Sequence, residues 1–199
     1  MILLPRLLGI YDDRTCLESP PLSESLDHPC PCKRVCAVLY HHDLDLGELE
    51  AKLEQHWGAI ERRSFSYPFS SGSTYYQDQM GTVHSRYWLS FEGLVDPGLM
   101  VYDKRWAMDQ ELVWAEKGLG VPRPINLDSG LVMRGRLALA TTKDFSHRLY
   151  LGRGIYGEVT LQFKKAKVIP MPWTYPDIAA GHYDAFLLAV KADFERDSR

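Results

Sequence analysis

The side chains best suited to chemistry are gathered in one stretch of the chain, between positions 143 and 153. It holds four hydrogen-bond donors for anions: Lys143, His147, Arg148 and Arg153. A guanidinium binds phosphate or carboxylate through two parallel hydrogen bonds, and an ammonium binds them as a point charge. The ordinary pKa of His147 lies near neutrality, which makes it the candidate acid or base. This stretch predicts a site for a small anionic ligand, phosphorylated or carboxylated.

Three carboxylates accompany these donors: Asp128, Asp144 and Glu158. Carboxylate oxygens are the ligands that Mg²⁺ prefers, and a carboxylate can also act as a general base. We expect Asp128 and Asp144 to hold Mg²⁺ if the site uses a metal, and His147 with Glu158 to be catalytic if a reaction follows. The alternative for Asp128, and for Asp144 with its neighbour Lys143, is ordinary turn chemistry.

A hairpin is predicted within the same stretch. A three-residue turn at 152–154 pairs Tyr150 with Tyr156 and Arg148 with Glu158, and it separates an apolar face from a polar face. The two tyrosines share the polar face, so we include them among the predicted ligand contacts. The alternative for Arg148 and Glu158 is a simple cross-strand ion pair.

The glycines of this hairpin also match the glycine-rich loop that covers ATP in protein kinases, through Gly152, Gly154, Gly157 and Val159. The other kinase motifs are absent from the sequence, a strand instead of a helix follows the glycines, and the chain has no P-loop. A structural hairpin turn is the simpler interpretation. The register also places His147 on the apolar face, where a structural histidine would lie.

The pattern of apolar residues predicts the elements that carry the hairpin. We expect strands at 34–40, 60–67, 86–91 and 136–142, and helices at 46–57, 97–117 and 183–194. The order strand, helix, strand, strand, helix, strand is typical of a ferredoxin-like fold. The sequence therefore predicts an α+β protein, a two-layer ferredoxin-like (βαββαβ) sandwich extended by C-terminal β-hairpins and a terminal helix.

The composition is that of a folded domain: 45% of the 199 residues are apolar, and the net charge is −3. Residues 17–33 hold four prolines without periodicity, so we expect a flexible leader at 1–32 and a single domain at 33–199. The chain has no apolar stretch of the length that a secretory signal or a membrane span needs, which predicts a cytoplasmic protein without membrane contact.

Two further motifs have both a functional and a structural interpretation. His41, His42 and Asp43 follow the first strand and can bind a metal together with His84. The segment Trp173–Pro176 can stack on a ligand or form a rigid corner over the sheet. The cysteines lack the paired two-residue spacing of a zinc site.

From about Val35 onwards, the chain resembles a bacterial family called domain of unknown function 4416. The strings that carry the resemblance are Tyr75–Gly81, Leu89–Glu92, Asn126–Asp128, Ala140–Asp144, Ser146–Gly152, Gly154–Tyr156, Glu158–Leu161 and Trp173–Asp177. The chain departs from the family pattern at Ser129, Leu131 and Gly157, where Pro, Tyr and Ala are expected. Members of this family are commonly labelled GTP-binding proteins, so the resemblance implies GTP as one candidate ligand. It implies no catalytic residue.

The sequence thus predicts a protein that binds a small anionic ligand, with or without Mg²⁺, and it leaves catalysis open. One alternative is a non-catalytic interaction or assembly module, for which a net charge near zero and many aromatic residues suit a homodimer. The other is an RNA-binding domain, based on Arg62, Arg63 and the lysines at 164–167. A pI of about 6.2 and the lack of a basic stripe argue against nucleic acid.

Overall fold

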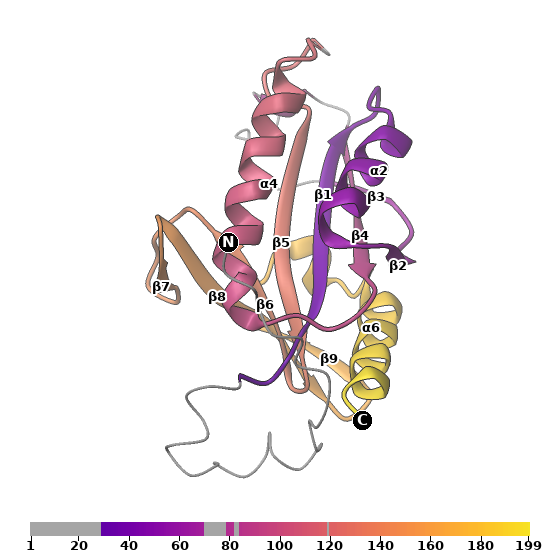
Figure 1. Ribbon diagram of the computed structural model, residues 1–199, viewed down its shortest axis with the longest axis vertical. Helices are drawn as coiled ribbons and strands as arrows, with labels where there is room; N and C mark the ends of the chain where they lie inside the picture. Colours follow the sequence, from indigo (N-terminus) through magenta and orange to yellow (C-terminus); the bar gives the residue numbers. More distant parts are fainter. Residues whose placement is uncertain (1–28, 70–78, 82–83, 119) are drawn as a thin grey trace, which may run out of the picture.

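The computed structural model describes residues 29–69, 79–81, 84–118 and 120–199, which form an α+β fold with one antiparallel sheet (Figure 1). The nine strands are β1 (Lys33–His41), β2 (Ile60–Arg63), β3 (Tyr67–Pro68), β4 (His84–Phe91), β5 (Ile125–Met133), β6 (Arg136–Thr141), β7 (Leu149–Gly152), β8 (Ile155–Lys164) and β9 (Lys167–Pro170). The described helices are α2 (Leu46–Trp57), α4 (Met100–Ala115), α5 (Pro176–Ala179) and α6 (Asp184–Asp197), and a 3₁₀ turn at Pro97–Leu99 precedes α4.

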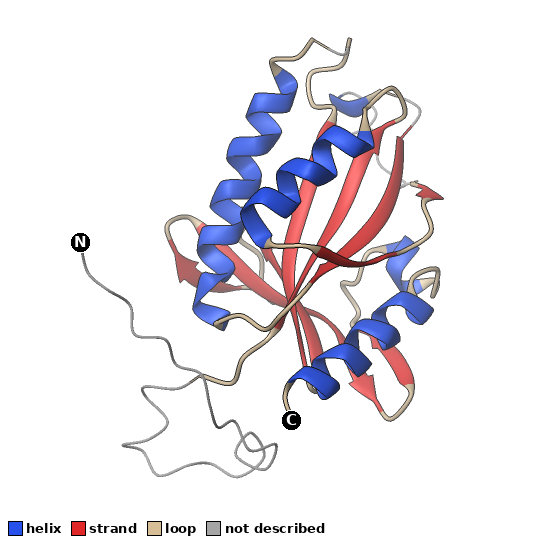
Figure 2. Cartoon of the chain, turned by 45° about the vertical axis from the view of Figure 1, so that its right-hand side comes forward, coloured by secondary structure: helices blue, strands red, loops and turns tan. Residues whose placement is uncertain are grey.

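The sheet runs in the order β2-β4-β1-β5-β6-β8-β7, with β3 beside β4 and β9 beside β8. Strand β5 pairs with β1 from Ile125 to Val132, but its register with β6 covers only Gly130 to Met133. Among the described strands, the first half of β5 therefore has a partner on one side only. Figure 2 shows the strands fanning apart from a common crossing region.

The strand that pairs with β1 lies earlier in the chain than the sequence predicts. The sequence places the sixth element at 136–142, whereas β5 is the strand that pairs with β1, and β6 is the next strand along the sheet. The apolar pattern does not reveal β5 because Asn126, Asp128 and Ser129 interrupt it. Asn126 and Ser129 are buried all the same.

Helix α2 forms where the sequence predicts it, for local reasons. The Asp45 carboxylate accepts hydrogen bonds from the backbone N–H groups of Gly47 and Glu48, which caps the N-terminus. Gly58, with φ +95°, ends the helix. The apolar side of this helix faces the sheet, with Leu49 and Leu53 fully buried.

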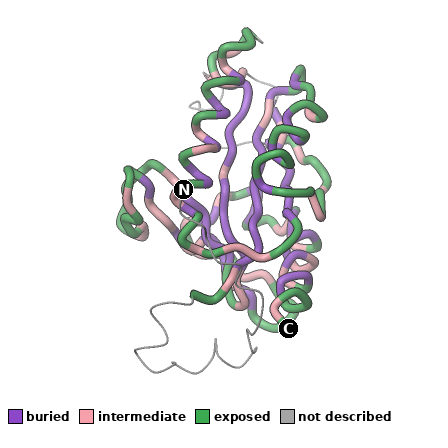
Figure 3. The backbone as a smooth tube through the Cα atoms, viewed as in Figure 1, coloured by how far each residue is buried: buried purple, intermediate pink, exposed green. Residues whose placement is uncertain are grey.

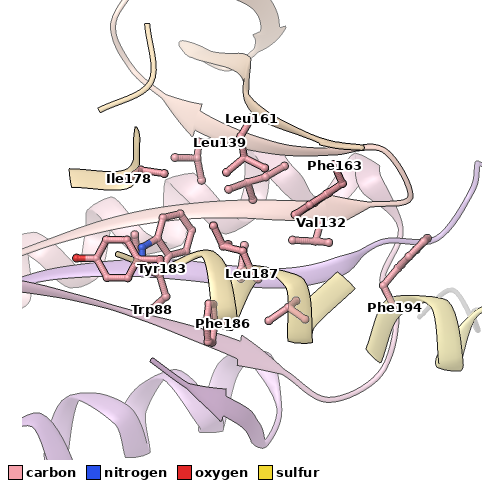
Figure 4. Close-up of a cluster of buried hydrophobic side chains, with 14 residues drawn as sticks. Trp88, Val132, Leu139, Leu161, Phe163, Ile178, Tyr183, Phe186, Leu187 and Phe194 are labelled. Carbon is pink, nitrogen blue, oxygen red and sulfur yellow. The ribbon is translucent and has the colours of Figure 1, made fainter. Parts of the chain in front are cut away.

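Alternate residues of β1 enter two separate cores. Cys36 and Val38 pack in the cluster that contains residues of α2 and α4, whereas Val35 and Ala37 pack in the cluster that contains residues of α6. Figure 3 shows the buried strands, and Figure 4 shows the second cluster, in which side chains of α6 lie against those of the sheet. Helices cover both faces of the sheet, so the fold has three layers where two were predicted.

The β7–β8 hairpin has the predicted pairing with a tighter turn. Tyr150 pairs with Tyr156, as expected, but the turn consists of two residues, Arg153 and Gly154. Both have positive φ, 54° and 76°, the conformation of a type I′ turn. The remaining residue, Leu151, is accommodated as an irregularity in β7.

The predicted leader lies outside the described residues except for positions 29–32. Within these, Cys32 is buried and forms an isolated bridge with Val95, so the folded part begins slightly before position 33. The family string at 75–81 is described only for residues 79–81. In the portion of the chain that is described, no helix has the length and apolar character needed to cross a membrane.

Candidate functional site

Three of the predicted site residues, Glu158, His147 and Arg148, are in contact in the structure. Strand β8 directs the Glu158 carboxylate inward, with 4% of the side chain exposed, and the Oε2 atom lies 3.1 Å from His147 Nε2 and 2.7 Å from Arg148 Nε. The Nη1 group of Arg148 donates to the backbone oxygen of Lys143 at 3.0 Å. His147 therefore lies on the polar face, contrary to the predicted register. It precedes β7 in a turn, where the alternation of a strand does not apply.

The His147 ring is held in place by aromatic neighbours. Trp173 stacks on it with a centroid distance of 4.5 Å and an interplanar angle of 10°, and Phe145 contacts it edge-on at 5.3 Å. The indole N–H of Trp173 donates to the backbone oxygen of Val159 at 2.9 Å, which fixes the stacking partner. When Nε2 carries the proton shared with Glu158, Nδ1 is the basic nitrogen. A carboxylate-held imidazole of this kind can serve as an acid or base.

Asp128 belongs to a second polar cluster, around the half of β5 that β6 does not pair. Its Oδ1 atom lies 3.4 Å from Lys104 Nζ, and its Oδ2 atom lies 4.0 Å from Arg86 Nη2. Burial raises the pKa of Asp128, but the nearby positive charges of Lys104 and Arg86 outweigh it, so this pKa lies below its ordinary value. The carboxylate is 20% exposed and ionised at neutral pH.

Arg86 and Lys104 belong to this cluster, although the sequence did not predict either of them as a site residue. The Nη1 group of Arg86 donates to both carboxylate oxygens of Asp177, at 2.9 and 2.8 Å. The guanidinium carbon lies 4.2 Å from the ring centroid of Phe69 and 5.1 Å from that of Tyr175. Only 1% of Arg86 is exposed, and within the described ranges its Nε and Nη2 atoms have no hydrogen-bond acceptor.

This arrangement presents one edge of a guanidinium for recognition. Asp177 holds the Nη1 end, and the guanidinium carbon lies over the aromatic rings of Phe69 and Tyr175. The two remaining groups, Nε and Nη2, can donate parallel hydrogen bonds to a carboxylate or phosphate. A buried donor without an acceptor costs about 1–3 kcal/mol, and more when it is charged, so an acceptor at this edge would stabilise the fold.

The segment Trp173–Asp177 links the two clusters. Trp173 stacks on His147, the Thr174 hydroxyl donates to the backbone oxygen of Thr160, and Tyr175 and Asp177 contact Arg86. The sequence predicts either a ligand-stacking element or a rigid corner for Trp173–Pro176. Its contacts support a corner that joins the Glu158 and Arg86 clusters along one face of the sheet.

The other predicted residues are distributed differently. The guanidinium of Arg153 lies 4.9 Å from the ring of Tyr102 on α4, toward the opposite sheet face. Lys143 and Asp144 are exposed in the loop between β6 and β7. Of the described side chains, one group of three or more can jointly bind a metal ion, and it contains neither Asp128 nor Asp144.

The edge strand β7 carries exposed apolar residues. Leu149 is 74% exposed, and Phe145, Tyr150 and Leu151 are also exposed. The leucines of β7 are therefore exposed, whereas Ile155 and Leu161 of the paired strand β8 are buried. Tyr150 packs edge-on against Tyr156 at a centroid distance of 5.2 Å.

Two remaining surfaces contain none of the predicted site residues. A hollow of about 400 Å³ lies between α2 and α4 and is lined by residues that include Glu48, Gln110 and Lys117. The arginines considered for RNA binding have acidic partners: Arg62 pairs with Asp193. Arg63 likewise pairs with Glu50.

The fold and these contacts define an α+β domain with two linked polar clusters on one face of an antiparallel sheet. A family model with the description Domain of unknown function (DUF4416) matches residues 30–194, and the chain belongs to this family. No curated protein and no solved structure matches the chain.

Proposed function

We propose that this protein binds a small anionic ligand, phosphorylated or carboxylated, on the sheet face that carries Arg86 and Glu158, and GTP is one candidate. The observation that carries the proposal is the Nε–Nη2 edge of Arg86, which is buried and has no acceptor among the residues described. Such an edge matches the two oxygens of a carboxylate or phosphate.

The charged residues around Arg86 support binding of an anion together with a bound cation. Arg86 and Lys104 balance the charges of Asp128 and Asp177, so the cluster is neutral before a ligand binds. Asp128 is partly exposed and supplies the type of oxygen that Mg²⁺ prefers. We assign Asp128 as the residue that would meet a Mg²⁺ ion carried by a nucleotide.

The Glu158 cluster is the second part of the proposed site. Arg148 supplies a further donor for the anion, and His147 with Glu158 supplies a candidate acid and base. The distances of 2.7 and 3.1 Å support a fixed arrangement of these three side chains. The proposed function is ligand binding, and no reaction is assigned to these side chains.

We also propose that β1, α2, β2, β4, α4 and β5 constitute a ferredoxin-like unit. The order β2-β4-β1-β5, with every neighbouring pair antiparallel, supports this assignment. Strands β6–β9 and helices α5 and α6 would then be an extension that adds the Glu158 cluster and the Trp173–Asp177 segment.

The test of binding is a thermal-shift series with the full chain and four probes: inorganic phosphate, GTP, ribose 5-phosphate and malate, each with and without Mg²⁺. A probe at about 100 times its Kd stabilises the fold by about 2.7 kcal/mol, or roughly 5–10 °C for a chain of this size. Arg86→Lys keeps the charge for Asp177 but lacks the two-pronged edge, so this variant should lose the shift.

Two more variants separate the parts of the site. Arg148→Ala reports whether the Glu158 cluster contributes to the affinity for the same probe. Arg105→Lys, an exposed residue of α4, is the matched control and should respond like the original chain. The absence of a shift with every phosphate and carboxylate, with and without Mg²⁺, would contradict the proposal.

A second candidate function is assembly of two copies through β7. The exposed apolar side chains on this edge strand, led by Leu149, support it because an unpaired edge can accept another strand. Light scattering across a concentration series tests it: a dimer that Leu149→Lys converts to a monomer is expected, and a monomer at all concentrations would exclude it.

A further inference from the structure

A separate polar group lies where β1 ends, on residues that the proposed ligand site does not use. Strand β1 ends at His41, and the chain turns at once, with the backbone N–H of Leu44 donating to the backbone oxygen of His41 at 3.1 Å. The turn brings the side chains of His41, His42 and Asp43 together. One ligand atom from each lies within 4.8 Å of the other two.

The distances inside this group are close to those of a metal site. His42 Nε2 lies 3.0 Å from Asp43 Oδ1, and His41 Nδ1 lies 3.7 Å from Asp43 Oδ2. In a tetrahedral zinc site with bonds of about 2.0–2.1 Å, neighbouring ligand atoms are about 3.3 Å apart. The two measured distances bracket this value, and the weak hydrogen bond that His41 Nδ1 accepts from the backbone N–H of Asp43, at 3.4 Å, must break when this nitrogen binds an ion.

The three residues differ in burial in a way that suits an accessible ion. His41 is buried, and its backbone N–H donates to the backbone oxygen of Pro124 at 2.8 Å, which fixes this ligand to the sheet. The side chains of His42 and Asp43 are 55% and 60% exposed. An ion held between them has one anchored ligand and a solvent side where water or a substrate can occupy the remaining positions.

The neighbouring strand adds a third histidine next to this group. His84 of β4 pairs in register with His41, and its Nδ1 lies 3.2 Å from the backbone oxygen of Gly81. When Nδ1 donates to this oxygen, the lone pair is on Nε2, the state that is typical of a metal-binding histidine. His84 is therefore a candidate for the outer part of the site.

We propose that His41, His42 and Asp43 bind one first-row divalent metal ion, with Zn²⁺ as the preferred ion. Two imidazoles and one carboxylate form a ligand set that suits Zn²⁺, whereas Mg²⁺ prefers oxygen ligands throughout. The alternative is that the carboxylate of Asp43 only forms ion pairs with the two histidines. The site involves none of the residues assigned to the anionic ligand.

The experiment uses the full chain without an affinity tag, stripped with EDTA and titrated with Zn²⁺ and, in parallel, with Co²⁺. At about 10 µM protein, a Kd of about 1 µM or lower gives saturation close to one equivalent of Zn²⁺. The Co²⁺ form should show visible absorption without the near-ultraviolet band of a thiolate ligand. Mg²⁺ should not compete.

Three variants locate the ion. Loss of a residue that only hydrogen-bonds to a metal ligand lowers metal affinity by about 10–100-fold. His42 and Asp43 are proposed as direct ligands, so His42→Ala and Asp43→Ala should each weaken Zn²⁺ binding by about 100-fold or more. Both residues are exposed, and an unchanged urea midpoint of the metal-free variants shows that they fold. His182→Ala, an exposed histidine stacked on Tyr67, is the control and should bind like the original chain.

Three results would overturn the proposal. The first is the lack of a stoichiometric Zn²⁺ equivalent in the original chain. The second is unchanged affinity in both His42→Ala and Asp43→Ala, which would place the ion elsewhere. The third is a thiolate band with Co²⁺, which would assign the ion to cysteines.

Discussion

The buried pair of Arg86 and Asp177 gives the most demanding prediction. Both carboxylate oxygens of Asp177 lie within 2.9 Å of Arg86 Nη1. In Asp177→Asn, the guanidinium of Arg86 keeps a hydrogen-bonding neighbour but loses this negative charge. The remaining carboxylate nearby, that of Asp128, is 4.0 Å from Nη2 and already faces Lys104. The variant therefore leaves a buried positive charge without a direct counter-charge.

The expected cost follows from this burial. Arg86 is 1% exposed, so solvent cannot replace the lost partner. Removal of one member of a buried ion pair costs about 3–5 kcal/mol. For a chain of about 200 residues, each kcal/mol lowers Tm by about 2–4 °C, which gives a decrease of about 6–20 °C. Replacement of both partners, in Arg86→Met with Asp177→Leu, should recover most of this loss because neither member of the pair remains as a buried charge without its partner.

The assay is urea unfolding at pH 7 with a matched control. Asp184→Asn makes the same change in the first turn of α6. Burial raises the pKa of Asp184, so its charge is mildly unfavourable in the folded chain, and its removal should change the free energy of unfolding by less than about 1 kcal/mol. If Asp177→Asn costs no more than this control, the reasoning about Arg86 is refuted.

Three further predictions concern other parts of the site and the sheet. Glu158→Gln removes the negative charge that accepts hydrogen bonds from His147 and Arg148, and it should lower the free energy of unfolding by about 2–3 kcal/mol in urea. Backbone amides in the loop before β7 should also exchange faster. Unchanged exchange in this loop would contradict the prediction. The folded pKa of Asp128 is lowered, so its contribution to stability is present above the unfolded pKa of about 3.9 and is lost as the pH falls through the lower folded value. The free energy of unfolding should therefore decrease less steeply between about pH 5 and pH 3 in Asp128→Asn than in the original chain, and equal slopes would exclude this role. A Cβ at Gly130 would lie 2.4 Å from the backbone oxygen of Ala138, so Gly130→Ala should cost about 3 kcal/mol or more, while Gly135→Ala, with open space around it, should be nearly neutral.

Local signals explain which elements the sequence predicts well. The apolar stripe of α2, its cap at Asp45 and its end at Gly58 are all encoded within 14 residues. Strand β5 has no such signal. Asp128 is tolerated there because Lys104, on a different element, lies against it, and a single sequence does not indicate that contact.

The same distinction applies to the site. Arg148 and Glu158 are 10 positions apart in one hairpin, so the strand register predicts that they meet. Arg86 and Asp177 are 91 positions apart, and neither has a local pattern that marks it as a partner of the other. Strand alternation predicts the wrong face for His147 because β7 begins two residues later, at Leu149.

The exposed leucines of β7 show a limit of face alternation. Alternation predicts which side chains share a face, and it does so correctly for Tyr150 and Tyr156. It does not indicate whether another element covers that face. No element among the described residues covers Leu149 or Leu151, and both side chains are exposed.

The most direct measurement is the nitrogen-15 NMR signal of the Arg86 side-chain Nε–H group, assigned by its loss in Arg86→Lys. Because this group is buried and has no acceptor among the described residues, addition of the probe that gives the largest thermal shift should move its signal strongly and saturably. The signal of an exposed arginine, Arg105, should hardly move. An Arg86 signal that stays in place while the probe stabilises the protein would show that the anion binds elsewhere.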